Sequence, residues 1–452
     1  MLNRLKLENF KAWERADLTF GKVTGLFGAN SAGKSSILDL LLLLKQTRNA
    51  TDRGIVLEFG GPADMVNLGT FADVVHHHDE SRRIRWLLEW TLPKTLTIKD
   101  PLNPGVTLFG GSSLQTRCEA GLRDSQLWVP ELAYRFDSTD FRLHAKEGSR
   151  GNYELTTSRR NFRFKRIRGR AWPLPKPIKT HLFPGAAKTF FQNSSFLGDF
   201  ELRYERLMDS LYYLGPLREH PKREYHWAGS RPEDVGQRGE RTIDAILAAT
   251  ARGTKISLGR GIPRKPFQEM ISDWLRKLEL IHSFVIDEVA PGTRLYRTTV
   301  RTLSSGAPTA LTDVGFGVSQ VLPVLVLLYY VPKGSTVLLE QPEIHLHPAV
   351  QSGLADGLLK VAQTRDVQII VESHSEHLLR RLQRRVAEGS AAADDIRLYF
   401  VSGSDGKADL AELALNEWGE IENWPDHFFG DEMGEIAAIT EASLKRKLAT
   451  TQ

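Results

Sequence analysis

VTGLFGANSAGKSSILDLLLLLK, residues 23–45, joins a short apolar run to a glycine-rich loop and then to a strongly apolar stretch. Its centre, GANSAGKS at residues 28–35, fits G-x-x-x-x-G-K-[ST], the pattern of a phosphate-binding loop. Glycines at both ends let the backbone wrap so that successive N–H groups point inward at phosphate oxygens. The stretch therefore predicts a strand over 23–27, a phosphate loop, and a buried helix near 35–45.

The residues of this loop predict ATP and Mg²⁺ as its ligands. Lys34 supplies positive charge for the β- and γ-phosphates, and Ser35 offers a hydroxyl to Mg²⁺. The helix that follows turns its positive N-terminus toward the same anion. The predicted nucleotide-binding residues are Gly28, Ala29, Asn30, Ser31, Ala32, Gly33, Lys34, Ser35 and Ser36.

Apolar, β-branched runs that end in polar residues follow much later in the chain. They cover 335–340, 366–372 and 397–401, and such continuous runs suit strands covered on both faces of a parallel sheet. Strands separated by helical stretches indicate an α/β fold. Ligands bind beyond the carboxyl ends of parallel strands, so Glu340 is predicted to face the loop and to bind the metal together with Ser35. His374, after the next strand, is predicted to reach a γ-phosphate, although a histidine so placed is also a common structural hydrogen-bond partner.

The remaining chain suggests three parts. We predict an N-terminal lobe with the loop over 1–95, an α+β insertion that forms a lid or arm over 96–300, and a C-terminal lobe over 301–452. Within the insertion, Asn161–Arg168 is expected to be a strand, and Thr242–Ala251 and Phe267–Ile281 are expected to be helices.

Several motifs resemble ABC-type ATPases of the RecF/SMC/OLD-like group, in particular the stand-alone AAA-type ATPases of bacterial defence and mobile-element loci. They are LENFKAW (7–13), GLFGANSAGKSS (25–36), YLGPLR (213–218), DVGFGVSQ (313–320), EQPEIHLHP (340–348), IIVESHSEHLL (369–379), and Trp424-Pro425 with Phe428-Phe429. The resemblance implies an ABC-type head with a mixed or parallel sheet that dimerises around two ATP molecules. Each ATP would be capped by the partner's signature segment, here Gly315, Phe316, Gly317 and Ser319, with Glu340 as the Walker B acid and His374 as the switch histidine.

Two positions depart from the pattern of this group. The signature usually begins with serine before paired glycines, whereas Gly315-Phe316-Gly317 stands here. The hydroxyl contact to the γ-phosphate either comes from Ser319 or is absent. The residue after the metal-binding acid is commonly a glutamate that polarises the attacking water, and here it is Gln341. An amide cannot accept a proton, and general-base assistance typically contributes about 10²–10⁴-fold. Hydrolysis is therefore expected to be slow unless the loop turns Glu343 inward.

A basic segment within the predicted insertion is a candidate nucleic-acid contact. Its basic side chains alternate with Phe162 and Phe164, and arginine can pair with phosphates while phenylalanine stacks on bases. A solvated or acid-paired strand explains the same pattern. The candidate residues are Arg159, Arg160, Arg163, Lys165, Arg166 and Arg168.

Composition limits the classes of protein that this chain can be. Its 452 residues are 41% hydrophobic and 25% charged, which excludes a disordered or collagen-like chain. The single cysteine and the lack of a long apolar run predict a cytoplasmic protein with no membrane contact. The net charge of +5 permits nucleic-acid binding without requiring it.

The preferred hypothesis is an ATP-dependent homodimeric switch that controls a separate effector, a nuclease or toxin, in a DNA-related or anti-phage system. One alternative is a RecF-like repair ATPase that acts directly on DNA. A second is a scaffold that ATP locks without catalysis, and a transporter motor fits least because its signature is missing.

Overall fold

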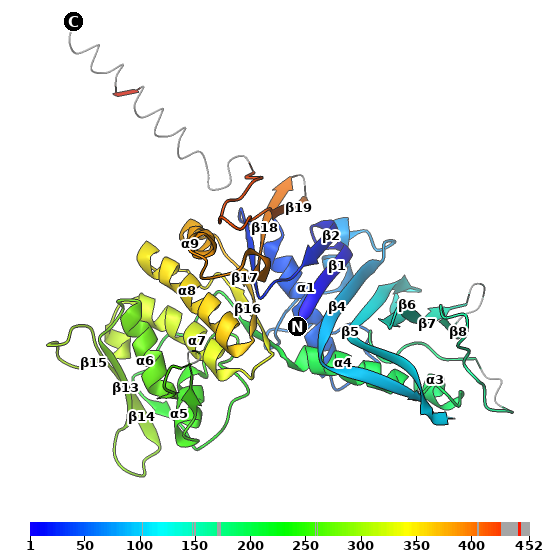
Figure 1. Cartoon of the computed structure of the whole chain (residues 1–452), viewed down its shortest axis with the longest axis horizontal. Helices are drawn as coiled ribbons and strands as arrows, with labels where there is room; N and C mark the ends of the chain where they lie inside the picture. The colour runs from blue at the N-terminus through cyan, green and yellow to red at the C-terminus, as the bar shows by residue number, and fades with distance from the viewer. Residues whose placement is uncertain are drawn as a thin grey trace, which may run out of the picture.

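Figure 1 shows the protein as a computed structural model. The structure describes residues 1–425, except 102, 147, 149, 150, 170–172, 258, 260 and 405, together with 442 and 443. Phe428 and Phe429, quoted for the resemblance, lie outside the described residues. No described helix combines the length and apolarity that crossing a bilayer requires.

A six-stranded mixed sheet lies at the centre of the molecule (Figure 1). Its order is β19-β18-β3-β17-β16-β9, and each neighbouring pair is parallel except β18 and β19. The predicted α/β class with a mixed or parallel sheet is confirmed. The strands are β3 (Val23–Gly28), β9 (Leu211–Leu214), β16 (Thr336–Glu340), β17 (Gln368–Glu372), β18 (Ile396–Ser404) and β19 (Lys407–Leu413).

The two faces of this sheet pack into two different hydrophobic cores. Leu338 and Ile370 pack into a core shared with helix α1 (Lys34–Asn49), whereas Val337, Leu339 and Ile369 pack into a core shared with helices α5 to α9. Side chains alternate between faces along a strand. Continuing that alternation places Glu340 and Glu372, the last residues of β16 and β17, on the α1 face.

A seven-stranded antiparallel sheet covers the α1 side of the molecule. Its order is β2-β1-β4-β5-β6-β7-β8, and the core between this sheet, α1 and α4 is rich in aromatic side chains. The elements of this side are β1 (Leu2–Phe10), β2 (Trp13–Thr19), α2 (Phe71–Val74), β4 (Ile84–Asp100), β5 (Asn103–Arg123), β6 (Gln126–Phe136), β7 (Thr139–Ala145), β8 (Tyr153–Thr157), α3 (Gly185–Thr189) and α4 (Leu197–Asp209).

Helices cover the other face of the central sheet, on the side of Figure 1 where α5, α6, α7, α8 and α9 are labelled. The helices are α5 (Thr242–Ala251), α6 (Phe267–Lys277), α7 (Phe316–Tyr330), α8 (Pro348–Arg365) and α9 (Glu376–Ala387). Small antiparallel pairings accompany them: β10 (Tyr225–His226), β13 (Ser283–Glu288) and β15 (Thr309–Ala310) with β14 (Leu295–Arg301), and β11 (Lys255–Ile256) with β12 (Lys265–Pro266). The single-turn 3₁₀ helices are His76–His78, Leu311–Asp313 and Ala393–Asp395.

The predicted boundaries at residues 95 and 300 both fall inside continuous strands. Strand β4 crosses residue 95 and joins β1 to β5 in one sheet, and β14 crosses residue 300. Strand β9, inside the predicted insertion, is a member of the central sheet. The division into three parts stays a prediction.

Candidate nucleotide-binding site

The glycine-rich loop connects β3 to α1, as predicted. Gly28 has a φ of +137°, and a Cβ there would collide with the Val401 carbonyl oxygen, so only glycine fits. Gly33 has a φ of +105° and precedes the first turn of α1. Its carbonyl accepts a hydrogen bond of 2.9 Å from the Trp13 indole, which anchors the loop against the neighbouring turn. Between these glycines, Ala29, Asn30 and Ser31 are exposed, whereas Ala32 is buried.

Lys34 folds over this loop. Its Nζ donates to the carbonyl oxygens of Gly28, at 3.1 Å, and Ala29, at 2.6 Å, and the side chain is only 3% exposed. Burial lowers the pKa of this ammonium, while the carboxylates of Glu372 and Glu343 act in the opposite direction. The ammonium is therefore held beside the backbone that would surround a phosphate, next to the buried carboxylates at the strand ends. Ser36, one turn into α1, is also buried.

Two buried carboxylates meet at the carboxyl ends of neighbouring strands. Glu340 and Glu372 pair in register across β16 and β17 and are 9% and 2% exposed. Burial, followed by repulsion from Glu372, raises the pKa of Glu340 to about 8, and burial also raises the pKa of Glu372. Because two nearby carboxyls resist ionising together, this pair favours a bound cation.

Ser35 and Glu340 are the predicted metal ligands, and Glu372 lies beside both of them. The Ser35 hydroxyl donates to Glu372 Oε1 at 3.0 Å, while Glu372 Oε2 is buried without a partner. Oxygen donors of this kind suit Mg²⁺. Sequence reasoning missed Glu372, although its place at the end of an apolar run, like that of Glu340, was a usable signal.

The three candidate catalytic residues lie beside this pair. Gln341 has a φ of +42°, and its N–H donates to the Glu372 carbonyl at 2.8 Å. This sharp turn is followed by Glu343, which is 6% exposed and whose Oε1 accepts the backbone N–H of His374 at 2.7 Å. Glu343 is therefore turned inward, and burial raises the pKa of its carboxyl. Glu343 Oε2 and His374 Nε2 are both buried without a hydrogen-bond partner.

A residue that the sequence did not single out for this site lies near the same carboxylates. Arg218 follows β9 and is 7% exposed, and its Nε and Nη1 have no hydrogen-bond partner. Burial lowers the pKa of this guanidinium to about 10, against the opposing effects of Tyr213, Glu340 and Glu343. Only its place in the YLGPLR motif drew attention to it.

The predicted signature residues form the start of α7. Gly315 precedes the helix, a Cβ at Gly317 would meet Leu280, and Phe316 is 60% exposed. The Ser319 hydroxyl donates to the Phe316 carbonyl at 2.8 Å, so it is bonded within its own helix. The exposed ring of Phe316 lies against the rings of His220 and His345.

The predicted basic strand is wrong. Residues 161–168 form no strand, and their one bridge joins Arg166 to Phe191. The reason is that Phe162 and Phe164 enter the aromatic core, where Phe162 packs edge-on against Phe109.

The basic side chains of this segment point elsewhere. Arg159 lies over Phe109 and Arg166 over Phe191, whereas Arg160, Arg163, Lys165 and Arg168 are exposed. Among the described residues, none of these last four has an ion pair. The candidate nucleic-acid residues therefore form an exposed basic loop and not a strand face.

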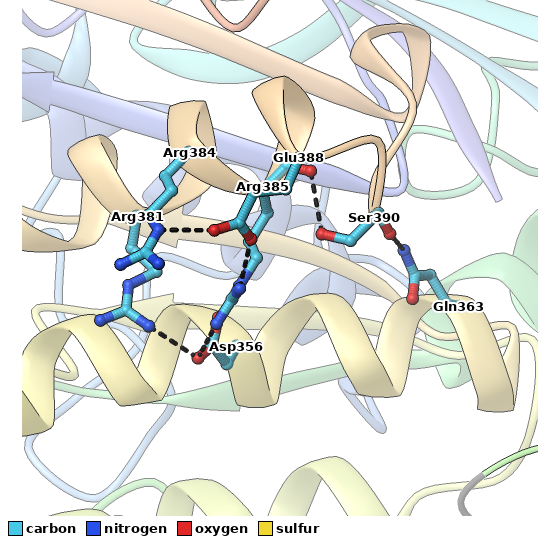
Figure 2. Close-up of polar contacts among 7 residues, drawn as sticks. All are labelled: Asp356, Gln363, Arg381, Arg384, Arg385, Glu388 and Ser390. Atoms are coloured by element: carbon cyan, nitrogen blue, oxygen red, sulfur yellow. Dashed lines mark hydrogen bonds and ion pairs between the residues drawn. The ribbon is translucent and has the colours of Figure 1, made fainter.

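The arginines of α9 form a contrasting cluster with α8 (Figure 2). Arg381 and Arg385 both donate to the carboxylate of Asp356, at 3.0 Å and 2.6 Å. Arg385 and Arg384 also pair with Glu388. These arginines therefore hold two helices together and do not form a free basic face.

Models of known protein families match segments of this chain. A family described as "AAA domain, putative AbiEii toxin, Type IV TA system" matches residues 144–380, more than half of the chain. The chain belongs to this AAA-domain family. A profile described as "AAA ATPase domain" matches residues 1–120 of the AAA-domain chain, and one described as "Protein of unknown function (DUF3696)" matches residues 392–439.

Relatives of the AAA-domain chain include the OLD nuclease of Thermus scotoductus. The two are 24% identical over 393 residues, which cover 83% of this chain and 59% of the nuclease, so the chain spans less than two thirds of that relative's length. Similar solved structures include an SMC head bound to the C-winged helix domain of ScpA. It is 13% identical in sequence, with a TM-score of 0.46, and the match covers 92% of this chain and 98% of that one. The SMC head domain from Thermotoga maritima has 12% identity and a TM-score of 0.41 over 91% and 99%. The predicted membership in the RecF/SMC/OLD-like group of ATPases is confirmed.

Proposed function

We propose that this ATPase binds ATP and Mg²⁺ at the carboxyl-end edge of the central sheet and acts as a slowly hydrolysing, homodimeric switch that controls a separate effector. The single observation that carries the proposal is the meeting of the phosphate loop, Lys34 and the buried pair Glu340 and Glu372 at this edge. Mg²⁺ would be held by Ser35, Glu340 and Glu372, where it stabilises the charge of the phosphates.

The residues of this chain have separate roles in the proposal. Loop amides and Lys34 bind the phosphates, and Glu343 accepts the proton of the attacking water through its unpartnered Oε2. His374 would contact the terminal phosphate, which its buried Nε2, unpartnered among the described residues, supports. Gln341, at the position where this group commonly carries its base, cannot accept a proton, and we propose that Glu343, two residues later, is a less effective substitute. Turnover is then slow, and nucleotide occupancy is the signal.

The exposed start of α7 supports the proposed dimer. The N–H groups of a helix N-terminus bind anions, and Phe316 leaves an apolar surface beside them, so this segment of one copy would cap the ATP of the other. The effector is proposed to be a nuclease or toxin of a DNA-related or anti-phage system, on the strength of the matched family's description and of the OLD relative.

The dimer is tested by light scattering of the protein with ATP and Mg²⁺, with ADP, and without nucleotide. We expect a dimer with ATP only, and a monomer for Lys34→Ala under all three conditions. Lys22→Ala is the matched control, because Lys22 pairs with Asp395 and precedes the opposite end of β3. A mass that does not respond to ATP, or a Lys34→Ala protein that still dimerises with ATP, contradicts the proposal.

The exposed basic loop favours a second candidate function, a RecF-like ATPase that acts directly on DNA. Arg159 pairs with Asp137, but other exposed basic side chains of the loop have no ion pair among the described residues, which leaves them free for phosphates. They are Arg160, Arg163, Lys165 and Arg168. Turnover measured with and without duplex DNA separates the two functions. A switch hydrolyses ATP slowly in both cases, whereas stimulation of about tenfold or more by DNA alone favours the second candidate.

A further inference from the structure

Arg218 is a buried cation that lacks a full set of partners. It is 7% exposed, and its Nε and Nη1 make no hydrogen bond within the part of the chain that the structure describes. Buried charged groups are normally paired, and an exception calls for an explanation such as a ligand. Arg365 is a useful comparison because its Nε is also unpartnered, but its Nη2 donates to the Val331 carbonyl at 2.7 Å.

The backbone brings Arg218 to the edge where the carboxylates lie. Leu214 pairs with Leu339, so the chain leaves β9 level with Glu340. The loop that follows is fixed at both ends, since Gly215 N–H donates to the Gln237 carbonyl and Glu219 N–H to the Arg238 carbonyl, each at 2.8 Å. A fixed loop keeps the guanidinium in place without an acidic partner.

Other unpartnered groups surround the same position. Glu340 and Glu343 both lie close enough to raise the pKa of Arg218, yet neither forms an ion pair with it in the described part of the chain. Glu343 Oε2 and His374 Nε2 are likewise buried and unpartnered. A further polar group that bonds these donors and acceptors would supply the partners that they lack.

We propose that Arg218 binds the terminal phosphate of ATP and makes this site prefer ATP over ADP. This inference rests on the proposed function. Lys34 would approach the phosphates from the glycine-rich loop, and Arg218 would approach from the end of β9, which β17 and β16 separate from β3 in the sheet. A guanidinium presents a planar set of N–H donors that matches phosphate oxygens, so ATP supplies the partners that its side chain lacks. ADP, which ends one phosphate earlier, leaves them unpaired.

The test measures affinity for a non-hydrolysable ATP analogue and for ADP, each with Mg²⁺, by titration calorimetry. For Arg218→Ala we expect affinity for the analogue to fall by about tenfold or more and affinity for ADP to change by less than about twofold. Arg365→Ala removes a partly buried arginine at the end of α8, and is expected to leave the ratio of the two affinities unchanged. An equal loss for both nucleotides, or no loss, overturns the assignment.

Two further variants keep the outcome decisive. If Arg218→Ala does not fold, Arg218→Lys keeps the charge without the planar fork, and an unchanged affinity ratio for it overturns the inference. Lys34→Ala is expected to lose both nucleotides. If it retains both, the proposed function fails as well, whereas a loss in Lys34→Ala beside an unchanged ratio in the Arg218 variants overturns this inference alone.

Discussion

The carboxyl-end edge of the central sheet and the contact between α8 and α9 are both rich in charged side chains, but they differ in how these side chains are paired. At the sheet edge, atoms of Arg218, Glu343, Glu372 and His374 are buried without partners. Between the helices, Asp356 accepts hydrogen bonds from two arginines that Figure 2 places around it. Since unpaired buried groups cost free energy, the comparison teaches that the first region is built for a ligand and the second for stability.

The largest expected effect is on the rate of ATP hydrolysis at the sheet edge, without a change in the fold. We expect Glu343→Gln to lower the rate of ATP hydrolysis in a single turnover by about 10²–10⁴-fold, because it removes the proposed general base. Nucleotide affinity should be retained, since the loop and Lys34 are untouched. Glu376→Gln, at the start of α9, where the carboxylate is partly exposed and pairs with Arg380, is the control. Unchanged turnover in Glu343→Gln would mean that another group accepts the proton.

The next largest effect is on the stability of the contact between α8 and α9, without a change at the nucleotide site. Asp356→Ala leaves Arg381 and Arg385, which are 24% and 27% exposed, without their shared carboxylate. We expect the free energy of unfolding in urea to fall by about 2 kcal/mol, less than for a fully buried pair. ATP affinity should not change. Arg384→Ala, whose side chain is 63% exposed, should cost less than about 0.5 kcal/mol. Equal costs for the two variants would remove the contrast between the regions.

The pH dependence of stability is a further test of how the sheet edge differs from the contact between α8 and α9. The pKa of Glu340 is raised from 4.5 to about 8, so the folded protein holds a proton that the unfolded chain releases. Stability from this group is therefore fully present below about pH 4.5 and is lost as the pH rises through 8. The expected loss is at most about 1.4 kcal/mol per pH unit for one proton. Urea denaturation of the nucleotide-free protein from pH 6 to 8 should show a smaller slope for Glu340→Gln, and an unchanged slope would contradict the assignment.

The smallest effect per residue concerns the basic loop. If it binds DNA, replacing Arg163, Lys165 and Arg168 with alanine should weaken duplex binding and reduce the slope of log affinity against log salt by about 2 to 3. Arg384→Ala with Arg380→Ala is the control, because both arginines already pair with acids on α9. An equal reduction in slope for loop and control variants would show that the contact is not specific to the loop.

The sequence anticipated the elements whose pattern is local. The strands over 23–27, 335–340 and 366–372 and the helix near 35–45 are confirmed, because continuous apolar runs and paired glycines leave few other conformations. It also named Glu343 as a substitute base on the condition that the loop turned inward. The loop does turn inward, through the positive φ of Gln341.

Long-range contacts decided the features that the sequence did not anticipate. Residues 161–168 alternate like a strand, but Phe162 and Phe164 gain more from the aromatic core than from a ladder. The spacing of the arginines in α9 is typical of a solvated helix face. In the fold, Asp356 of α8, more than twenty residues away, lies beside them. The importance of Arg218 depends on an absence of partners, which no local pattern can encode.

From the sequence alone came the phosphate loop, the acidic strand end, the α/β class and the family, because each depends on residue types at fixed short spacings. Only the tertiary structure decided which polar groups find partners. Pairing depends on how β9, β16, β17 and α1 converge on one edge, and side chains that meet there, such as Ser35 and Glu372, come from segments 337 residues apart.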